Sequence, residues 1–189
     1  MRNLILMFFC LLIALDSFAQ TSSKQNNKDI AEYRAKAYLI KNVLDNKNDT
    51  ITGKSILFET EALSSASSGE LTSLYYNCKQ NKKEGFLLVF LSDRVNTQGV
   101  VFNNYTFKNI PILKAKELLQ MISLNIDIFK SIKVDYQNKY NFYFKFDDLT
   151  ILLSRINGIL KIRVFWDDYD VDWGSTAFNK TYRRFFKKI

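Results

Sequence analysis

The sequence predicts an α+β fold in which antiparallel strands alternate with three helices. Three observations indicate it: short apolar runs separated by polar turns, helical spacing of apolar residues in three segments, and an Asn157-Gly158 pair between two runs of strand-like residues. We expect antiparallel β-meander sheets with an N-terminal helix, a central helix at about 111–131 and a basic C-terminal helix at about 175–188.

The first residues have the pattern of a secretory signal peptide. Arg2 precedes an apolar run that ends at Asp16, and small residues, Ser17 and Ala19, occupy positions −3 and −1 of a cleavage site. The run is shorter than the roughly 17–25 residues that cross a bilayer, so we expect no transmembrane segment after cleavage. The sequence therefore predicts removal of residues 1–19, cleavage after Ala19, and export to the periplasm or the extracellular space.

The remaining chain is predicted to contain a polar, disordered tail at 20–28 and a single α+β domain at 29–189. The formal net charge of +8 favours anionic partners, and export argues against nucleic acid as one of them. The chain has no histidine, which excludes Ser-His-Asp triads and histidine-ligated zinc sites. After cleavage Cys78 is the only cysteine, so an internal disulfide is excluded, and we expect no cofactor.

The first half of the chain is predicted to be a helix followed by strands. Residues 29–44 have apolar side chains at helical spacing, predicted to face the core: Ile30, Tyr33, Ala37, Ile40 and Leu44. Strands are expected at 56–63, 71–79, 86–91 and 100–107. The run FLLVFL at 86–91 lacks alternation, which indicates a strand covered on both faces.

Pro111 is predicted to open the central helix. One stripe of that helix should be buried because its apolar residues recur every three or four positions: Ala115, Leu118, Leu119, Ile122, Ile126 and Phe129.

Residues 140–166 are predicted to form a three-stranded antiparallel meander with a defined register. A two-residue turn at Asn157-Gly158 places Leu153 opposite Ile162, and a second turn at 147–148 places Leu153 opposite Phe142. Both turns put the same side chains on one face. The predicted inward residues are Phe142, Phe144, Phe146, Leu149, Ile151, Leu153, Leu160, Ile162, Val164 and Trp166.

Three aspartates, Asp168, Asp170 and Asp172, follow this meander at alternate positions. A continued strand would drive their carboxylates into the core, so the strand should end or bulge near Asp167 and turn the aspartates outward. They are candidate metal ligands, but a calcium loop read from Asp168 has Trp173 where glycine is required. The alternative is a solvated strand end that leads into a helix capped by Ser175 or Thr176.

The outer face of the meander carries the candidate ligand-binding residues. Bases and aromatic side chains alternate there: Tyr143, Lys145, Lys161, Arg163 and Phe165, with Leu152 among them. Such a face can bind an anionic or glycan-like ligand through charge and stacking. The alternative is that a helix packs over the aromatic rings and the lysine stems extend past it to water.

The leading functional prediction is an exported, non-enzymatic binding module. Two alternatives remain: a periplasmic immunity or inhibitor protein that binds an acidic protein partner, and a carboxylate-dependent hydrolase. Glu59 and Glu61 would share a strand face and are the candidate carboxylates of the hydrolase, although alternating charge on a solvated strand gives the same pattern.

Overall fold

The computed structural model of the chain describes residues 28–44, 55–95, 97–132 and 140–189. The predicted signal peptide and residues 20–27 of the predicted tail lie outside the described residues, whereas Lys28 is already helical. A helix at 28–39 continues into a π-helical turn, η1 (Ile40–Leu44). The elements that follow are β1 (Glu59–Ser65), β2 (Leu71–Cys78), β3 (Lys83–Val95), β4 (Val101–Pro111), α2 (Ile112–Ser131), β5 (Phe142–Phe146), β6 (Leu149–Ile156), β7 (Ile159–Trp166), β8 (Tyr169–Asp172) and α4 (Ser175–Phe185).

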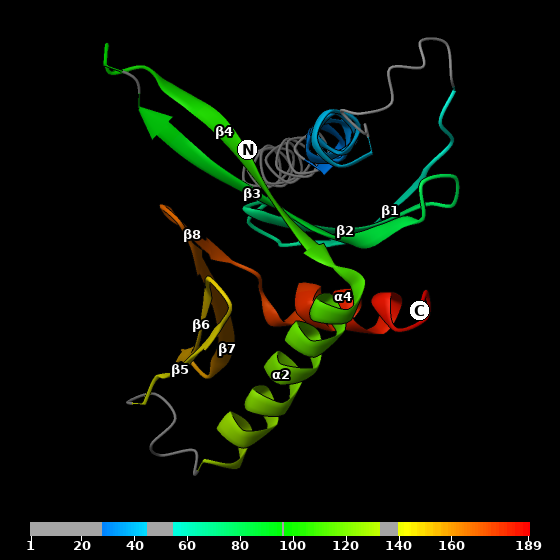
Figure 1. Cartoon of the computed structure of the whole chain (residues 1–189). Helices are drawn as coiled ribbons and strands as arrows, with labels where there is room; N and C mark the ends of the chain where they lie inside the picture. The colour runs from blue at the N-terminus through cyan, green and yellow to red at the C-terminus, as the bar shows by residue number, and fades with distance from the viewer. Residues whose placement is uncertain (1–27, 45–54, 96, 133–139) are drawn as a thin grey trace, which may run out of the picture.

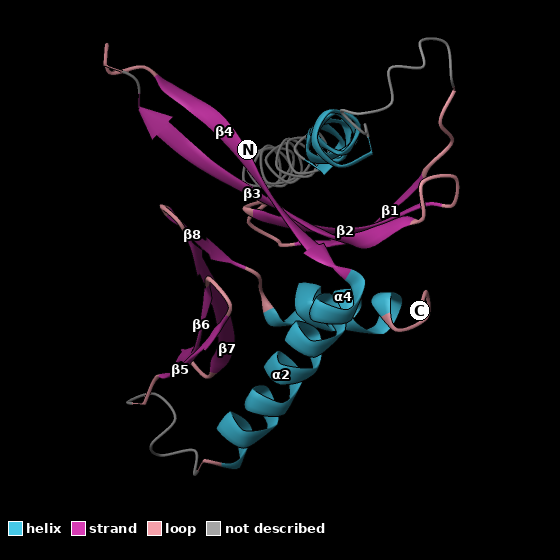
Figure 2. Cartoon of the chain, in the orientation of Figure 1, coloured by secondary structure: helices cyan, strands magenta, loops and turns pink. Residues whose placement is uncertain are grey.

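The strands form two antiparallel four-stranded meanders, β1-β2-β3-β4 and β5-β6-β7-β8, each followed by a helix (Figures 1 and 2). The N-terminal helix lies on one side of the first sheet, while α2 and α4 lie on the other side with the second sheet. The predicted α+β class, with N-terminal, central and C-terminal helices, is therefore confirmed. Among the described residues, no helix is both long enough and apolar enough to cross a membrane.

The strand β3 is buried on both faces, as its lack of alternation predicts. Phe86, Leu88 and Phe90 belong to the larger core, which also contains residues of α2, α4 and the second sheet. Leu87 and Val89 point the other way, into a smaller core beneath the N-terminal helix. The first sheet is thus the central layer of the molecule.

The predicted buried stripe of the N-terminal helix is wrong except at Leu44. Ala31, Ala35 and Leu39 face the sheet, whereas Tyr33 is 71% exposed and Ile40 51% exposed. Both stripes have helical spacing, but the small alanines let the helix approach β2 and β3 closely. Side chains of the β2–β3 turn then bind the last carbonyl groups of the helix, since Asn81 Nδ2 donates a 2.8 Å hydrogen bond to the Leu44 oxygen.

The helix α2 buries the six residues that its spacing predicts, Ala115 to Phe129. Pro111 ends β4 and is the N-cap of α2, where its missing N–H removes one unpaired donor. The opposite side of α2 is solvent-exposed, with Leu113 and Leu124 among its exposed apolar residues.

The predicted register of the second sheet is confirmed. Leu153 lies opposite both Phe142 and Ile162, and Ile151 lies opposite both Phe144 and Val164. The turn residues Asp147 and Asn157 have φ of 49° and 52°, a left-handed conformation that Asp and Asn tolerate better than most residues. All ten residues predicted to face inward belong to the larger core or pack against it.

The second sheet has a fourth strand that the sequence analysis missed. Asp167, with φ of 53°, begins a third two-residue turn, and Trp166 pairs with Tyr169 across it. The strand thus ends near Asp167, as predicted, in a hairpin turn and not in the alternative bulge. The hairpin reverses the chain, places Tyr169, Val171 and Trp173 in the core and leaves Asp170 and Asp172 on the outer face.

The helix α4 ends at Phe185, three residues before the predicted end, and its predicted side-chain cap is wrong. Gly174 is the N-cap, and no side chain caps the helix. The helix docks on the first sheet through a buried hydrogen bond of 2.6 Å between the hydroxyl groups of Thr181 and Ser73. Arg184 Nη1 also donates a 2.8 Å hydrogen bond to the oxygen of Leu63, where the β1–β2 register shifts.

Candidate functional site

The outer face of the second sheet brings together the five residues predicted to bind a ligand. Tyr143 is 67% exposed, Lys145 is exposed, and Lys161, Arg163 and Phe165 are half-buried. The residues of α2 and α4 that contact this sheet pack with its inner face instead. The described helices therefore do not cover the aromatic side chains, contrary to the alternative interpretation.

Cross-strand pairing arranges this outer face in rows. Tyr143 pairs with Leu152, Leu152 with Arg163, and Arg163 with Asp172. The next row contains Lys145, Thr150, Phe165 and Asp170. Two of the three predicted metal ligands thus share the face of the basic and aromatic residues.

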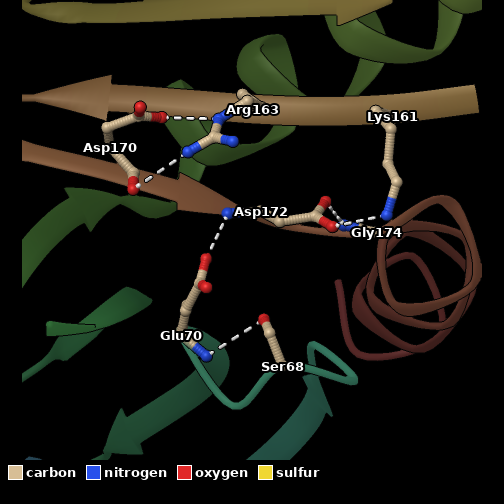
Figure 3. A network of polar contacts seen from close by, with 7 residues as sticks. All are labelled: Ser68, Glu70, Lys161, Arg163, Asp170, Asp172 and Gly174. Atoms are coloured by element: carbon tan, nitrogen blue, oxygen red, sulfur yellow. Dashed lines mark hydrogen bonds and ion pairs between the residues drawn. The ribbon is translucent and has the colours of Figure 1, made fainter. Parts of the chain in front are cut away.

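Arg163 and Asp170 form a diagonal ion pair between β7 and β8. Arg163 Nε lies 2.7 Å from Asp170 Oδ1, and this hydrogen bond raises the pKa of the Arg163 guanidinium above its usual value. The side chains of Arg163 and Asp170 are 42% and 48% exposed, so the pair contributes little to stability. Its consequence is geometric, because Arg163 Nη2 also donates a 3.5 Å hydrogen bond to the Asp170 backbone oxygen, so the guanidinium is held against β8 (Figure 3).

Lys161 and Asp172 form the second pair on this face. Lys161 Nζ lies 3.1 Å from Asp172 Oδ2, while Asp172 Oδ1 accepts a 2.8 Å hydrogen bond from the Gly174 amide. The Asp172 amide in turn donates a 2.8 Å hydrogen bond to Glu70 Oε2, from the β1–β2 loop (Figure 3). This network joins the second sheet to the first and fixes the positions of the polar groups.

A cavity of about 430 Å³ adjoins the outer face at Lys161 and Asp172. It lies between the end of β1, the start of β7 and the first turn of α4. Hydroxyl and ammonium groups are prominent in its lining, which includes Ser64, Ser175, Thr176 and Lys180. Lys161 and Asp172 therefore belong both to the outer face and to the lining of the cavity.

The aspartates proposed as metal ligands do not converge. Asp168 lies in the β7–β8 turn, while Asp170 and Asp172 bind Arg163 and Lys161. Within the described ranges, no group of three His, Cys, Asp or Glu side chains is arranged to hold a metal ion. Each carboxylate that a cation would need on β8 is occupied by a base.

Glu59 and Glu61, the candidate carboxylates of a hydrolase, lie away from this site. Lys188 Nζ is 3.3 Å from Glu59 Oε1 and 2.5 Å from Glu61 Oε2, so the same ammonium holds both. These contacts raise the pKa of Lys188 above its usual value. The two glutamates therefore share a face, as predicted, and they anchor the end of the chain to β1.

The aspartates were predicted to face outward, but the hairpin that brings Asp170 and Asp172 beside Arg163 and Lys161 was not predicted. The signal was present, because the alternation of buried residues continues past Asp167 with its parity reversed, as a hairpin requires. Glu70 and Ser64 had no such signal, since they reach the site from the first sheet and its β1–β2 loop.

Comparisons with protein-family models, with curated proteins and with solved structures gave no match. The class of the protein is therefore described from its fold and candidate site alone. It is an α+β protein of two antiparallel meanders, and the outer face of its second sheet is basic and aromatic.

Proposed function

We propose that this chain is an exported, non-enzymatic binding module that holds an anionic or glycan-like ligand on the outer face of its second sheet. The observation that carries the proposal is the exposed ring of Tyr143 in the same cross-strand row as Arg163. An exposed aromatic ring gives a ligand an apolar platform, and a nearby guanidinium gives it directed hydrogen bonds.

The ion pairs favour the glycan-like ligand over a strongly anionic one. Two of the three bases, Lys161 and Arg163, are already bound to aspartates, whereas Lys145 has no ion-pair partner among the described residues. An anion would have to compete with Asp170 and Asp172. The hydroxyl groups of a sugar need donors and acceptors side by side in fixed positions, and the two pairs supply both at little further ordering cost.

Affinity electrophoresis of the purified chain in gels containing a neutral β-glucan or polygalacturonate tests the proposal. We expect retardation by at least one polymer and about tenfold weaker binding for Tyr143→Ala, since one stacked ring contributes roughly 1–3 kcal/mol. Tyr33→Ala is the matched control, because Tyr33 is 71% exposed on the N-terminal helix, far from this face.

Salt distinguishes the two ligand classes. Binding of a neutral glycan should change little between about 50 and 200 mM salt, whereas binding of an anionic polymer should weaken steeply through screening. Absence of retardation by both polymers, or equal effects of the Tyr143 and Tyr33 variants, would overturn the proposal. Cleavage of either polymer by wild type but not by Glu59→Gln would support the hydrolase instead.

A further inference from the structure

The strand β4 is the edge of the first sheet and has only β3 beside it in the described part of the chain. It is 11 residues long, and its pairing with β3 continues in one register from Gly85–Pro111 to Val95–Val101 without a bulge. With β3 it forms a hairpin that extends beyond the rest of the sheet (Figure 1). A long, regular edge of this kind presents backbone N–H and C=O groups in position for another strand.

Both faces of β4 are already packed. Phe107 stacks on Tyr38 of the N-terminal helix, with ring centroids 4.7 Å apart. On the opposite face Asn104 Nδ2 donates a 2.7 Å hydrogen bond to Tyr169 Oη, and Lys108 binds Asp148. The strand is therefore contacted on both faces between residues 104 and 108, and within the described residues no second strand lies beside its backbone edge.

The part of this edge near the hairpin tip lacks the usual protection against pairing. Edge strands commonly carry lysine, proline or a bulge. In β4 Lys108 and Pro111 lie at the end that leads into α2, and residues 97–107, TQGVVFNNYTF, contain no charge and no proline. At the tip Val101 and Phe102 are 61% and 46% exposed although both are apolar. The composition favours strand addition over solvation.

We propose that β4 is a dimerisation edge at which it pairs antiparallel with β4 of a second copy of this chain. A two-fold axis perpendicular to the sheet requires the two residue numbers of each pair to have an even sum, because paired side chains must share a face. The register with Asn104 opposite Asn104 of the second copy meets this condition. It places Val101 opposite Phe107 and Phe102 opposite Thr106 of the second copy.

This register explains why the occupant is the chain itself. Val101 and Phe102 are covered by β-branched and aromatic partners, which stabilise antiparallel pairs, and no charge opposes another charge within residues 101–107. The result is one continuous eight-stranded sheet. The inference is independent of the ligand-binding face, which belongs to the other sheet.

Sedimentation analysis of the purified chain beginning at Gln20 tests the pairing. We expect a reversible dimer at micromolar concentration. Val101→Lys should weaken dimerisation by about tenfold or more, since a lysine on the edge opposes strand addition. Leu124→Lys is the matched control, because Leu124 is 62% exposed on α2, and it should leave the dimer unchanged.

Cysteine cross-linking tests the register separately. Asn104→Cys should give a covalent dimer on mild oxidation or with a short bis-thiol reagent, because the two copies of residue 104 face each other. Val101→Cys should not, since its two copies would lie far apart along the paired strands. A monomer at all concentrations, a dimer insensitive to Val101→Lys, or cross-linking at Val101 in place of Asn104 would overturn the proposal.

Discussion

Trp166 Nε1 donates a 2.9 Å hydrogen bond to Asp148 Oδ2, and the same carboxylate binds Lys108 of the first sheet. Lys108 Nζ also lies 5.1 Å from the centre of the Trp166 ring. One aspartate in a turn therefore joins β4 to β7, which belong to different sheets.

Because of Asp148, the free energy of unfolding is expected to fall as the pH becomes acidic. The hydrogen bond from Lys108 lowers the pKa of the Asp148 carboxyl below its ordinary value of 3.8, so the fold favours the ionised form. This contribution is complete at pH values above 3.8 and is lost as the pH falls through the lower folded pKa. Asp148→Asn should therefore lower the urea midpoint at neutral pH, with a difference from wild type that narrows under acid.

The neighbouring Asp147→Asn is the control, because asparagine also tolerates the left-handed conformation at this position. It should change the urea midpoint little at either pH. An Asp148→Asn variant as stable as wild type at neutral pH would show that the Lys108 contact contributes nothing.

Gly85 is expected to be intolerant of any side chain. The ring of Tyr76 crosses over it, so an added Cβ would lie 2.6 Å from Tyr76 Oη and 2.8 Å from Cε1 and Cζ. Tyr76 is buried, and its hydroxyl group donates a 3.0 Å hydrogen bond to Asn109 Oδ1. Moving the ring would therefore disturb core packing and break this hydrogen bond. Gly85→Ala should cost about 1–3 kcal/mol of unfolding free energy.

Urea denaturation measures that cost. Ser92→Ala in the same strand should stay within about 0.5 kcal/mol of wild type, as most substitutions at partly exposed positions do. Equal midpoints for Gly85→Ala and wild type would mean that Tyr76 repacks freely.

Calcium is expected not to stabilise the protein. Asp170 and Asp172 are bound to Arg163 and Lys161, so a cation would have to displace two bases and draw the carboxylates away from their strand positions. The melting temperature should be the same with millimolar calcium and with a chelator. A rise of several degrees with calcium would reverse this prediction.

The strands were predictable because their pattern has a period of two. Two turns that agree on one register fixed Phe144, Ile151 and Val164 as neighbours, and the structure pairs them so. The N-terminal helix was harder, because Tyr33 and Ala35 fit equally good stripes. Which stripe is buried depends on the close packing of the helix against β2 and β3, which favours the small side chain of Ala35.

The candidate site was predictable to the extent that it lies on one sheet. Tyr143, Lys145, Lys161, Arg163 and Phe165 follow from alternation alone. Asp170 faces outward as predicted, but its position beside Arg163 was missed, because an Asp167-Asp168 turn carries a weaker hairpin signal than Asn-Gly. Contacts between sheets, such as that from Asp172 to Glu70, depend on packing that no local pattern encodes.

The mature N-terminus is expected to be Gln20. Ser17 and Ala19 give the small residues that signal peptidase requires, and Asp16 closes the apolar run. Mass spectrometry of the protein exported by a Gram-negative host should find residues 1–19 absent. Ala19→Leu should block cleavage. Retention of residues 1–19 in the wild-type protein would contradict this prediction and indicate a membrane-anchored protein instead.

The final prediction separates the two faces of the second sheet. Val164 is fully buried, so Val164→Asp places an unpaired charge in the larger core and should unfold the protein. The triple variant Lys145→Gln, Lys161→Gln and Arg163→Gln should stay folded, because it removes two partly exposed ion pairs worth about 0–1 kcal/mol each.

Circular dichroism and thermal melting distinguish these outcomes, and affinity electrophoresis of the folded triple variant then reports on the face itself. We expect retardation by the bound polymer to be lost, since the variant lacks the charged donors of Lys161 and Arg163 and the ion pairs that hold them in place. A folded triple variant with unchanged retardation would show that the ligand binds elsewhere on the molecule. An unfolded triple variant would contradict the register, because side chains on a solvated face contribute too little stability to unfold the domain when they are replaced.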